Sequence, residues 1–260
     1  MKLDLQRLYR HRELLWQWTN REIKVRYKQS LLGAAWALVQ PLALMLVFTV
    51  VFSFLAKVPT GDTPYPLFSY TGLVVWTFVA TSITFASTSL VNNFNLITKV
   101  YFPREILPIA SIGATFVDFL VAGILLLGVL AWYRTPVTPA LLWLPVLMVL
   151  QVMLVIGVAL PAAAISVSFR DVRFVIPLGL QLWLYATPVA YPVTLVPERF
   201  RYVYALNPMV GLVDSYRRVF IQGEPPVPEY VALCAVLSTV LAAAGYLYFK
   251  HAESTFADRI

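Results

Sequence analysis

The sequence contains apolar stretches that are too long and too poor in charge to be the core of a water-soluble domain. Residues 29–56 and residues 135–169 carry no charged side chain, and only 13% of the whole chain is charged, against about a quarter in soluble domains. Only helices and closed barrels satisfy every backbone polar group in lipid, and continuous apolar runs favour helices over barrel strands. The sequence therefore predicts an all-α integral membrane protein.

Six stretches approach or exceed the roughly 20 apolar residues that a helix needs to cross a bilayer. They cover residues 29–56, 68–91, 106–133, 135–169, 174–197 and 230–249. An even number of crossings places both termini on one side, together with 14 of the 20 lysine and arginine residues. Because cytoplasmic segments are enriched in basic residues, both termini are predicted to be cytoplasmic.

Residues 1–30 are predicted to form a basic, amphipathic helix that lies along the membrane surface. They hold eight lysine or arginine residues, and apolar side chains recur among these at nearly helical spacing: Leu5, Leu8, Tyr9, Leu15, Trp16 and Trp18. Tryptophan combined with basic residues favours the membrane interface. The alternative is a basic flank that only sets the topology. The chain then divides into this interface segment, a six-span domain at 31–250 and a cytoplasmic tail at 251–260.

Residues 187–221, between spans five and six, are too polar and too often interrupted by proline for another crossing. Their breaks lie at Pro188, Pro192 and Asn207-Pro208. Non-helical backbone at membrane depth is tolerated only where it is buried in protein or lines a cavity. The pattern predicts two short re-entrant helices on the outer side, at 196–206 and 209–221, in a region that we name the outer gate segment.

Two polar features interrupt the spans. The loop at 92–105 keeps Lys99, Arg104 and Glu105 together with a Phe102-Pro103 corner, and the topology makes this loop cytoplasmic. Asp118 lies within the third span, where an aspartate costs about 2.5–3.5 kcal/mol even on modest insertion scales. It is predicted to face protein or water. We expect its carboxyl group, charged or protonated, to be hydrogen-bonded to a Ser, Thr or Tyr hydroxyl on a neighbouring helix; the alternatives are an anchor for a moving helix and a contact with the substrate. An ion pair would have to come from another helix or from a loop, because this span contains no basic residue.

The sequence lacks the residues that ATP binding and metal binding require. No G-x-x-x-x-G-K-[ST] motif occurs, so the chain is not expected to bind ATP by itself. His11 and His251 lie near opposite ends, and no Cys/His cluster has metal-ligand spacing. The net charge of +7 is concentrated before the first span, which indicates topology rather than binding of nucleic acid. The sequence predicts neither an enzyme nor a metal protein.

Three stretches together resemble a known family. These are "REIKVRYKQSLLGAAWALVQPL" before the first span, "LITKVYFPREILPIAS" in the polar loop and "LNPMVGLVDSYRRVF" before the last span. They are similar to the permease subunit of type-2 ABC exporters that carry lipid-linked polysaccharides, such as O-antigen and teichoic acid, across the bacterial inner membrane. The resemblance extends from about residue 12 to residue 250.

The resemblance implies a homodimer with two separate ATPase subunits, which bind the ATP and Mg²⁺. It implies that the 92–105 loop is a coupling loop seated on the ATPase. Its expected coupling residues are Asn95, Lys99, Tyr101, Phe102, Pro103, Arg104 and Glu105. It also implies that Pro188, Pro192, Asn207 and Pro208 belong to a gate.

The resemblance further implies a translocation path lined chiefly by spans one and five. Aromatic rings there could stack on sugar rings: Trp36, Phe48, Phe52, Trp183, Tyr185 and Tyr191. The alternative is that these rings pack against lipid or neighbouring helices. The leading hypothesis is an ATP-driven exporter of a lipid-linked, O-antigen-like glycan. Export of teichoic acid, capsule, a drug or a lipid is the alternative, and an ATP-independent carrier or channel is less favoured because midplane charge pairs are missing.

Overall fold

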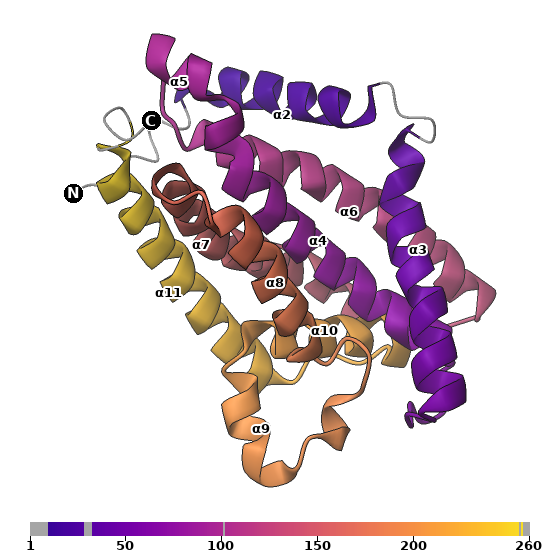
Figure 1. The fold of residues 1–260 in the computed structure, drawn as a ribbon. Coiled ribbons are helices and arrows are strands. Elements are labelled where there is room, and N and C mark those ends of the chain that lie inside the picture. Colours follow the sequence, from indigo (N-terminus) through magenta and orange to yellow (C-terminus); the bar gives the residue numbers. More distant parts are fainter. Residues whose placement is uncertain (1–9, 29–32, 101, 255, 257–260) are drawn as a thin grey trace.

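The computed structural model describes residues 10–28, 33–100, 102–254 and 256, and this part of the chain is helical with no β-strand (Figure 1). Five helical segments are long and apolar enough to cross a membrane. They are α3 with its continuation η2 (Trp36–Leu55), α4 (Tyr65–Asn92), α6 (Ile106–Trp132), η3 with α7 (Pro139–Ser168) and α11 (Pro228–Glu253). The prediction of an all-α membrane protein is confirmed.

The remaining elements are shorter. They are α2 (Arg12–Tyr27), η1 (Gly33–Ala35), α5 (Phe94–Lys99), α8 (Val172–Tyr185), η4 (Val193–Leu195), α9 (Glu198–Ala205), α10 (Pro208–Arg217) and η5 (Arg218–Gln222). The short helices expected at 196–206 and 209–221 are present as α9 and as α10 with η5. Residues 1–30 contain the expected helix as α2, while Leu5, Leu8 and Tyr9 lie outside the described residues.

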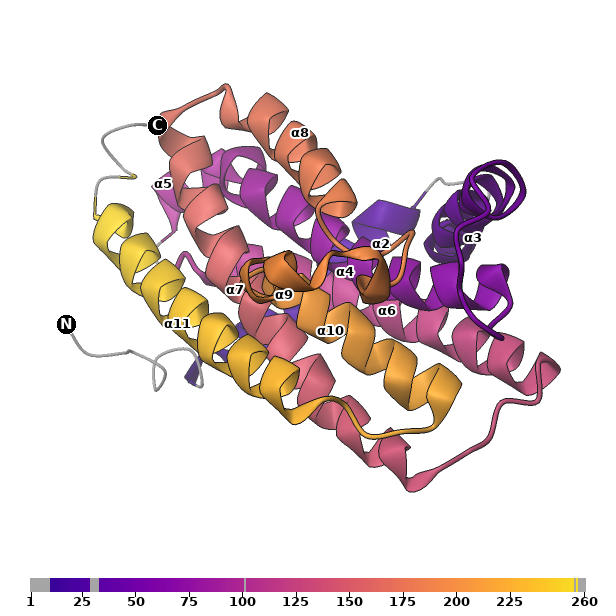
Figure 2. The ribbon, with the colours of Figure 1, turned by 90° about the horizontal axis from the view of Figure 1, so that it is seen from below.

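The fold is organised around α4. Most of its apolar stretch (61%) is buried inside the chain, against 11% for α3 with η2, and α4 packs against α3, α6, α7, α8 and α10. Pro41 lies inside α3, and the helix widens into the π-helical η2 from Thr49. Seen from below, α3 stands at the edge of the bundle (Figure 2). One face of α3 therefore remains available to lipid or to another chain.

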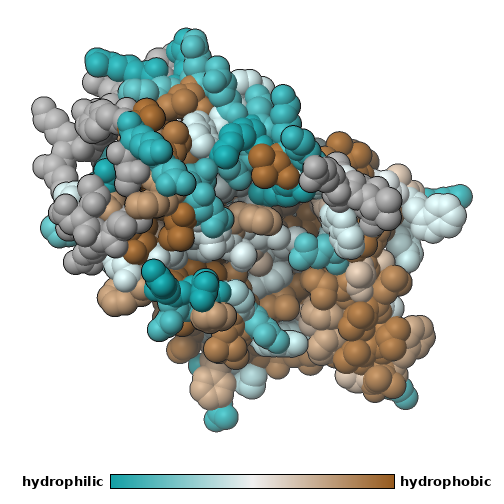
Figure 3. Space-filling view, turned by 45° about the horizontal axis from the view of Figure 1, so that its top comes forward, coloured by the Kyte–Doolittle hydropathy of each residue, from teal (hydrophilic) through white to brown (hydrophobic). Residues whose placement is uncertain are grey.

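The two ends of the bundle differ in character. Helices α2 and α5 lie together at one end, while α9 and α10 lie at the other (Figure 1). Hydrophilic side chains gather over the end that carries α2 and α5, and hydrophobic ones cover the surface below it (Figure 3). Helix α2 runs across the spans and packs against α6. Helix α2 therefore lies across the end of the bundle, as a helix at a membrane interface would.

The span expected at 174–197 differs from the prediction. It is helical only over Val172–Tyr185, which makes 14 residues, or about 21 Å at about 1.5 Å per residue. A crossing needs roughly 20 residues. The helix ends at Tyr185, before Pro188, although it contains Pro177 in its interior.

Two glycines let α7 and α11 approach each other closely. A Cβ atom on Gly157 would lie 2.6 Å from the Leu241 carbonyl carbon, and one on Gly245 would collide with the Gly157 carbonyl group. Small residues at helix interfaces permit such close backbone packing in membranes. The close packing of α7 on α11 therefore requires glycine, which has no Cβ atom, at both positions.

We expect Gly245→Ala to force α7 and α11 apart and to lower the free energy of unfolding by about 1–3 kcal/mol, the usual cost of overpacking. Chemical denaturation of the detergent-solubilised protein measures this change. Gly123→Ala is the matched control, because a Cβ atom there meets nothing within 4 Å. Equal stability of the two variants would contradict the packing assignment.

Candidate functional site

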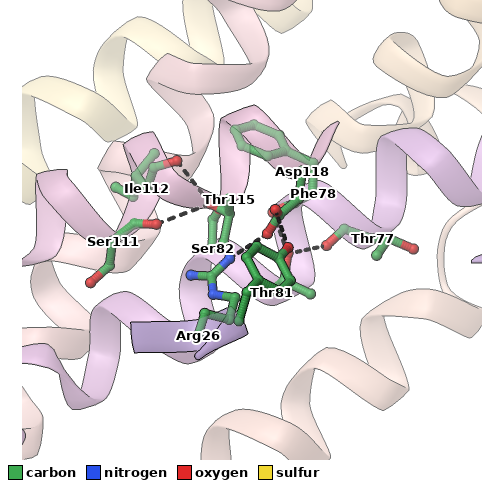
Figure 4. A network of polar contacts seen from close by, with 10 residues as sticks. Arg26, Thr77, Phe78, Thr81, Ser82, Ser111, Ile112, Thr115 and Asp118 are labelled. Atoms are coloured by element: carbon green, nitrogen blue, oxygen red, sulfur yellow. Dashed lines mark hydrogen bonds and ion pairs between the residues drawn. The ribbon is translucent and has the colours of Figure 1, made fainter. Parts of the chain in front are cut away.

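Asp118 receives two partners from the C-terminal end of the surface helix. Arg26 of α2 forms an ion pair with one carboxylate oxygen, and the Tyr27 hydroxyl donates a hydrogen bond to the other. Figure 4 shows Arg26 and Asp118 pointing toward each other from α2 and α6. The expected hydroxyl partner on a neighbouring helix is thus Tyr27. The ion pair comes from another helix, because α6 contains no basic residue.

The junction is partly shielded from solvent. The side chains of Arg26 and Asp118 are 15% and 22% exposed, and the Arg26 guanidinium also lies over the Phe85 ring at 4.1 Å from its centroid. Burial, reinforced by the hydrogen bond to Asp118, raises the pKa of Tyr27 to about 12. The Tyr27 hydroxyl therefore stays protonated at physiological pH and remains a donor.

Hydroxyl groups continue this junction between α4 and α6. Ser82 and Thr115 are hydrogen-bonded across the two helices at 2.6 Å, and Thr115 also donates to the Ile112 carbonyl oxygen at 2.8 Å (Figure 4). Beside them, α2, α3, α4 and α6 enclose a partly open cavity of about 280 Å³. The cavity is lined by Arg26, Tyr27, Trp36, Ala37, Gln40, Val74, Thr77, Phe78, Thr81, Phe85, Thr115, Asp118, Phe119 and Ala122.

The 92–105 loop contains α5, and its second half is fastened to the end of α11. Glu105 is fully buried and its Oε1 lies 2.7 Å from the Lys250 Nζ. The Arg104 side chain donates to the Glu253 carbonyl oxygen at 2.9 Å. Phe102 is buried in an apolar cluster that includes Phe249. These contacts lie within the chain, so Phe102 and Glu105 hold the loop in place and offer no surface to a partner.

Other residues of the loop do face outward. Asn95 and Lys99 are exposed on α5, Arg104 is half-buried, and Pro103 is buried. Tyr101 lies outside the described residues. The loop therefore has an exposed half, formed by α5, and an anchored half at 102–105. The sequence pattern did not distinguish the two halves.

The outer gate segment depends on Arg217, a residue that no sequence motif distinguished. Its side chain is nearly buried and donates to the carbonyl oxygens of Phe68, Pro188 and Val189, the last at 2.6 Å. The guanidinium also stacks on the Phe68 ring, 3.5 Å from the centroid. Gly72 makes room for it, because a Cβ atom there would lie 2.7 Å from an Arg217 nitrogen. Arg217 thus satisfies the backbone where α8 breaks off.

Asn207 makes a second tie in the same segment. Its Oδ1 accepts from the Trp183 indole nitrogen at 2.9 Å and from the Met209 backbone amide at 3.1 Å, capping α10. Its Nδ2 donates to the Ala186 carbonyl oxygen at 3.1 Å. Pro208 is buried at the start of α10. The structure therefore brings Pro188, Asn207 and Pro208 into one connected region, with Pro192 at the start of the η4 turn.

The six candidate path aromatics do not form one lining within a single chain. Trp36 and Tyr185 are exposed, whereas Phe48 is buried and packs edge-on against Phe52 at 5.3 Å. Trp183 packs edge-on against Trp76. The Tyr191 hydroxyl is shared between the Tyr185 carbonyl oxygen and the Tyr204 hydroxyl. Phe48 and Trp183 thus have packing roles inside the chain.

Across the part of the chain that the structure describes, no group of three or more His, Cys, Asp and Glu side chains could hold a metal ion. The candidate site consists of polar junctions that join helices and of α5, which carries the exposed side chains of Asn95 and Lys99. Such an arrangement can hold moving parts together and bind a partner, and it contains no assembled nucleophile with a base.

Comparison with known proteins identifies similar sequences. The family model described as ABC-2 type transporter matches residues 13–221. The chain is 31% identical to the O-antigen export system permease protein RfbA of Myxococcus xanthus, covering 97% of each protein. It is 29% identical to the protein of the same name from Klebsiella pneumoniae, over 99% of this chain and 98% of that one. The polysialic acid transport protein KpsM of Escherichia coli is 23% identical over 87% of this chain.

We expect a double-mutant cycle with Arg26→Gln and Asp118→Asn to give a coupling energy of about 0.5–3 kcal/mol, as for residues in direct contact. The free energy of unfolding in detergent is the quantity measured. Asp118→Asn alone should destabilise the protein, because it leaves the Arg26 guanidinium without its carboxylate.

The exposed pair Arg201–Glu198 provides the matched control, since its side chains are 34% and 88% exposed. Its coupling energy should be only about 0–1 kcal/mol. A coupling energy for Arg26 and Asp118 no larger than that of the exposed pair would show that the junction does not hold α2 to α6.

Proposed function

Because this chain belongs to the ABC-2 type transporter family, we propose that it exports a lipid-linked, O-antigen-like polysaccharide from the cytoplasm. The observation that carries the substrate class is the identity of about 30% with O-antigen export permeases over nearly the whole of both chains. Members of this family contain no ATPase domain, and a partner subunit hydrolyses ATP. Capsule or teichoic acid export is the second candidate, and the similarity to KpsM at 23% identity favours it less.

We place the protein in the bacterial inner membrane as a homodimer with two ATPase subunits. The end with α2, α5 and the C-terminal end of α11 then faces the cytoplasm. Two observations support this orientation: basic residues crowd the segments at this end, and hydrophilic side chains gather there (Figure 3). The positive charges of cytoplasmic segments set orientation in this way.

Six crossings follow if α8 and the broken backbone after it together form the fifth. Helix α8 spans only part of the bilayer, and Thr187, Val189 and Ala190 continue from it as buried, non-helical chain. Irregular backbone at membrane depth needs internal hydrogen-bond donors. Arg217 supplies them to Pro188 and Val189, which supports a crossing completed inside the protein.

We propose that α5 is the part of the coupling loop that contacts the ATPase. Asn95 and Lys99 are exposed on it, whereas Phe102 and Glu105 are buried. The ion pair between Glu105 and Lys250 links the loop to α11, and Glu105 directly precedes α6. A displacement of α5 by the ATPase would therefore reach two spans. Of the aromatics, Trp36 and Tyr185 have the exposed rings that a translocation path requires.

We expect the purified chain alone to hydrolyse no ATP. Co-expression with the ATPase of an adjacent reading frame should yield a stable complex and place glycan on the cell surface of an export-deficient host.

Lys99→Glu should weaken the complex and reduce export, because reversing the charge of an interface residue replaces attraction with repulsion. Affinity co-purification and surface-glycan immunoblots measure the two effects.

Lys57→Glu is the matched control, since Lys57 is also exposed but lies at the end of η2, outside the coupling loop. It should leave the complex intact. ATP hydrolysis by the lone chain, or normal glycan export without any ATPase subunit, would exclude the proposed function.

A further inference from the structure

The cavity beside Asp118 has a chemical character that the junction alone does not explain. It lies where the end of α2 meets the first turns of α3, and it opens against α4 and α6. Its wall includes the Arg26–Asp118 ion pair, the hydroxyls of Tyr27 and Thr81, the Gln40 amide and the Trp36 ring. Donors, acceptors and an aromatic face therefore converge on one space.

Gln40 is the observation that points to an occupant. It is an exposed amide within a span that carries no charge, and among the described residues its side chain has no hydrogen-bond partner. A polar amide in an apolar span is stabilised when it finds a hydrogen-bond partner. At this site the amide borders the cavity, where water or a polar ligand can satisfy it.

The charge of the cavity selects among ligands. Arg26 and Asp118 neutralise each other, so the site has no excess positive charge with which to hold a phosphate. A neutral ligand with several hydroxyl groups instead fits a cavity wall that both donates and accepts hydrogen bonds. The Trp36 ring, about half exposed, offers an apolar face with a polar handle. This combination fits the two sides of a sugar ring.

The size of the cavity sets a limit on the ligand. Its volume is about 280 Å³, at the lower end of the roughly 300–1,000 Å³ of ligand pockets. One sugar ring fits such a space, whereas a chain of sugars does not.

We propose that this cavity is a binding site for a single neutral sugar unit, with Trp36 stacking on the ring and Gln40 bonding its hydroxyls. The proposal rests on the proposed glycan export, which it deepens by naming residues that select the sugar. Because the site adjoins the Arg26–Asp118 junction, an occupied cavity also contacts the end of α2. Sugar binding and the position of the surface helix are thereby connected.

Saturation-transfer NMR on the complex with its ATPase in nanodiscs tests the proposal. The probes are D-mannose, D-galactose, L-rhamnose, N-acetyl-D-glucosamine and the oligosaccharides released by mild acid from the surface polysaccharide of the source strain. We expect at least one to bind. Gln40→Leu and Trp36→Leu should each weaken that binding by about threefold to tenfold, the value of one lost hydrogen bond or contact.

Ser53→Ala and Trp132→Leu are the controls, one in the same span and one at an exposed ring far from the cavity in sequence; neither residue lines the cavity. They should bind like the unchanged protein. Absence of binding, equal binding by all variants, or displacement of the sugar by inorganic phosphate would overturn the proposal. Sugar binding without glycan export would instead refute the proposed function and leave the site standing, while export without sugar binding would do the reverse.

Discussion

The contact between Arg26 and Asp118 is the interaction on which the arrangement of the bundle end that carries α2 depends. A lone aspartate in a span is costly, by about 2.5–3.5 kcal/mol on modest scales. The chain compensates this cost with two donors from α2. The same contact joins the C-terminal end of α2 to α6, and both residues line the cavity. A residue that would be a liability in lipid thereby becomes the attachment point of a peripheral helix.

At the opposite end of the bundle the buried charged side chain is an arginine instead of an aspartate, and its partners are hydrogen-bond acceptors instead of donors. The buried Arg217 side chain donates to three carbonyl oxygens and stacks on the Phe68 ring, and the Asp214 carboxyl group is close enough to interact with its charge. Phe68 belongs to α4, whereas Pro188 and Val189 lie in the break after α8, where no helix satisfies their carbonyl groups. Each polar side chain thus appears where the backbone or a charge would otherwise lack a partner in lipid.

The sequence was sufficient for the features that depend on local pattern. Charge-free runs predicted the long helices, and proline positions predicted α9 and α10. It was insufficient where a contact joins residues far apart in the chain. Arg26 and Asp118 are 92 positions apart, and Arg217 and Phe68 are 149 apart, so neither pair has a periodic signature. Phe102 and Glu105 looked like surface residues of a polar loop, because nothing near them in sequence reveals that Lys250 and Phe249 cover them. The early end of α8 was missed because its apolar composition continues beyond the last helical turn.

In the proposed topology, six crossings place α5 and the α7–α8 turn on the cytoplasmic side, opposite the outer gate segment. Single cysteines at Lys99, Arg170, Asp62 and Glu198, in a background with Cys234→Ala, test it directly with a membrane-impermeant maleimide. All four positions are exposed, whereas Cys234 is buried. With only the outer membrane permeabilised, Asp62→Cys and Glu198→Cys should react, and Lys99→Cys and Arg170→Cys should react only after lysis. Reaction of Arg170→Cys and Glu198→Cys from the same side would show that α8 does not complete a crossing, and the account would be wrong.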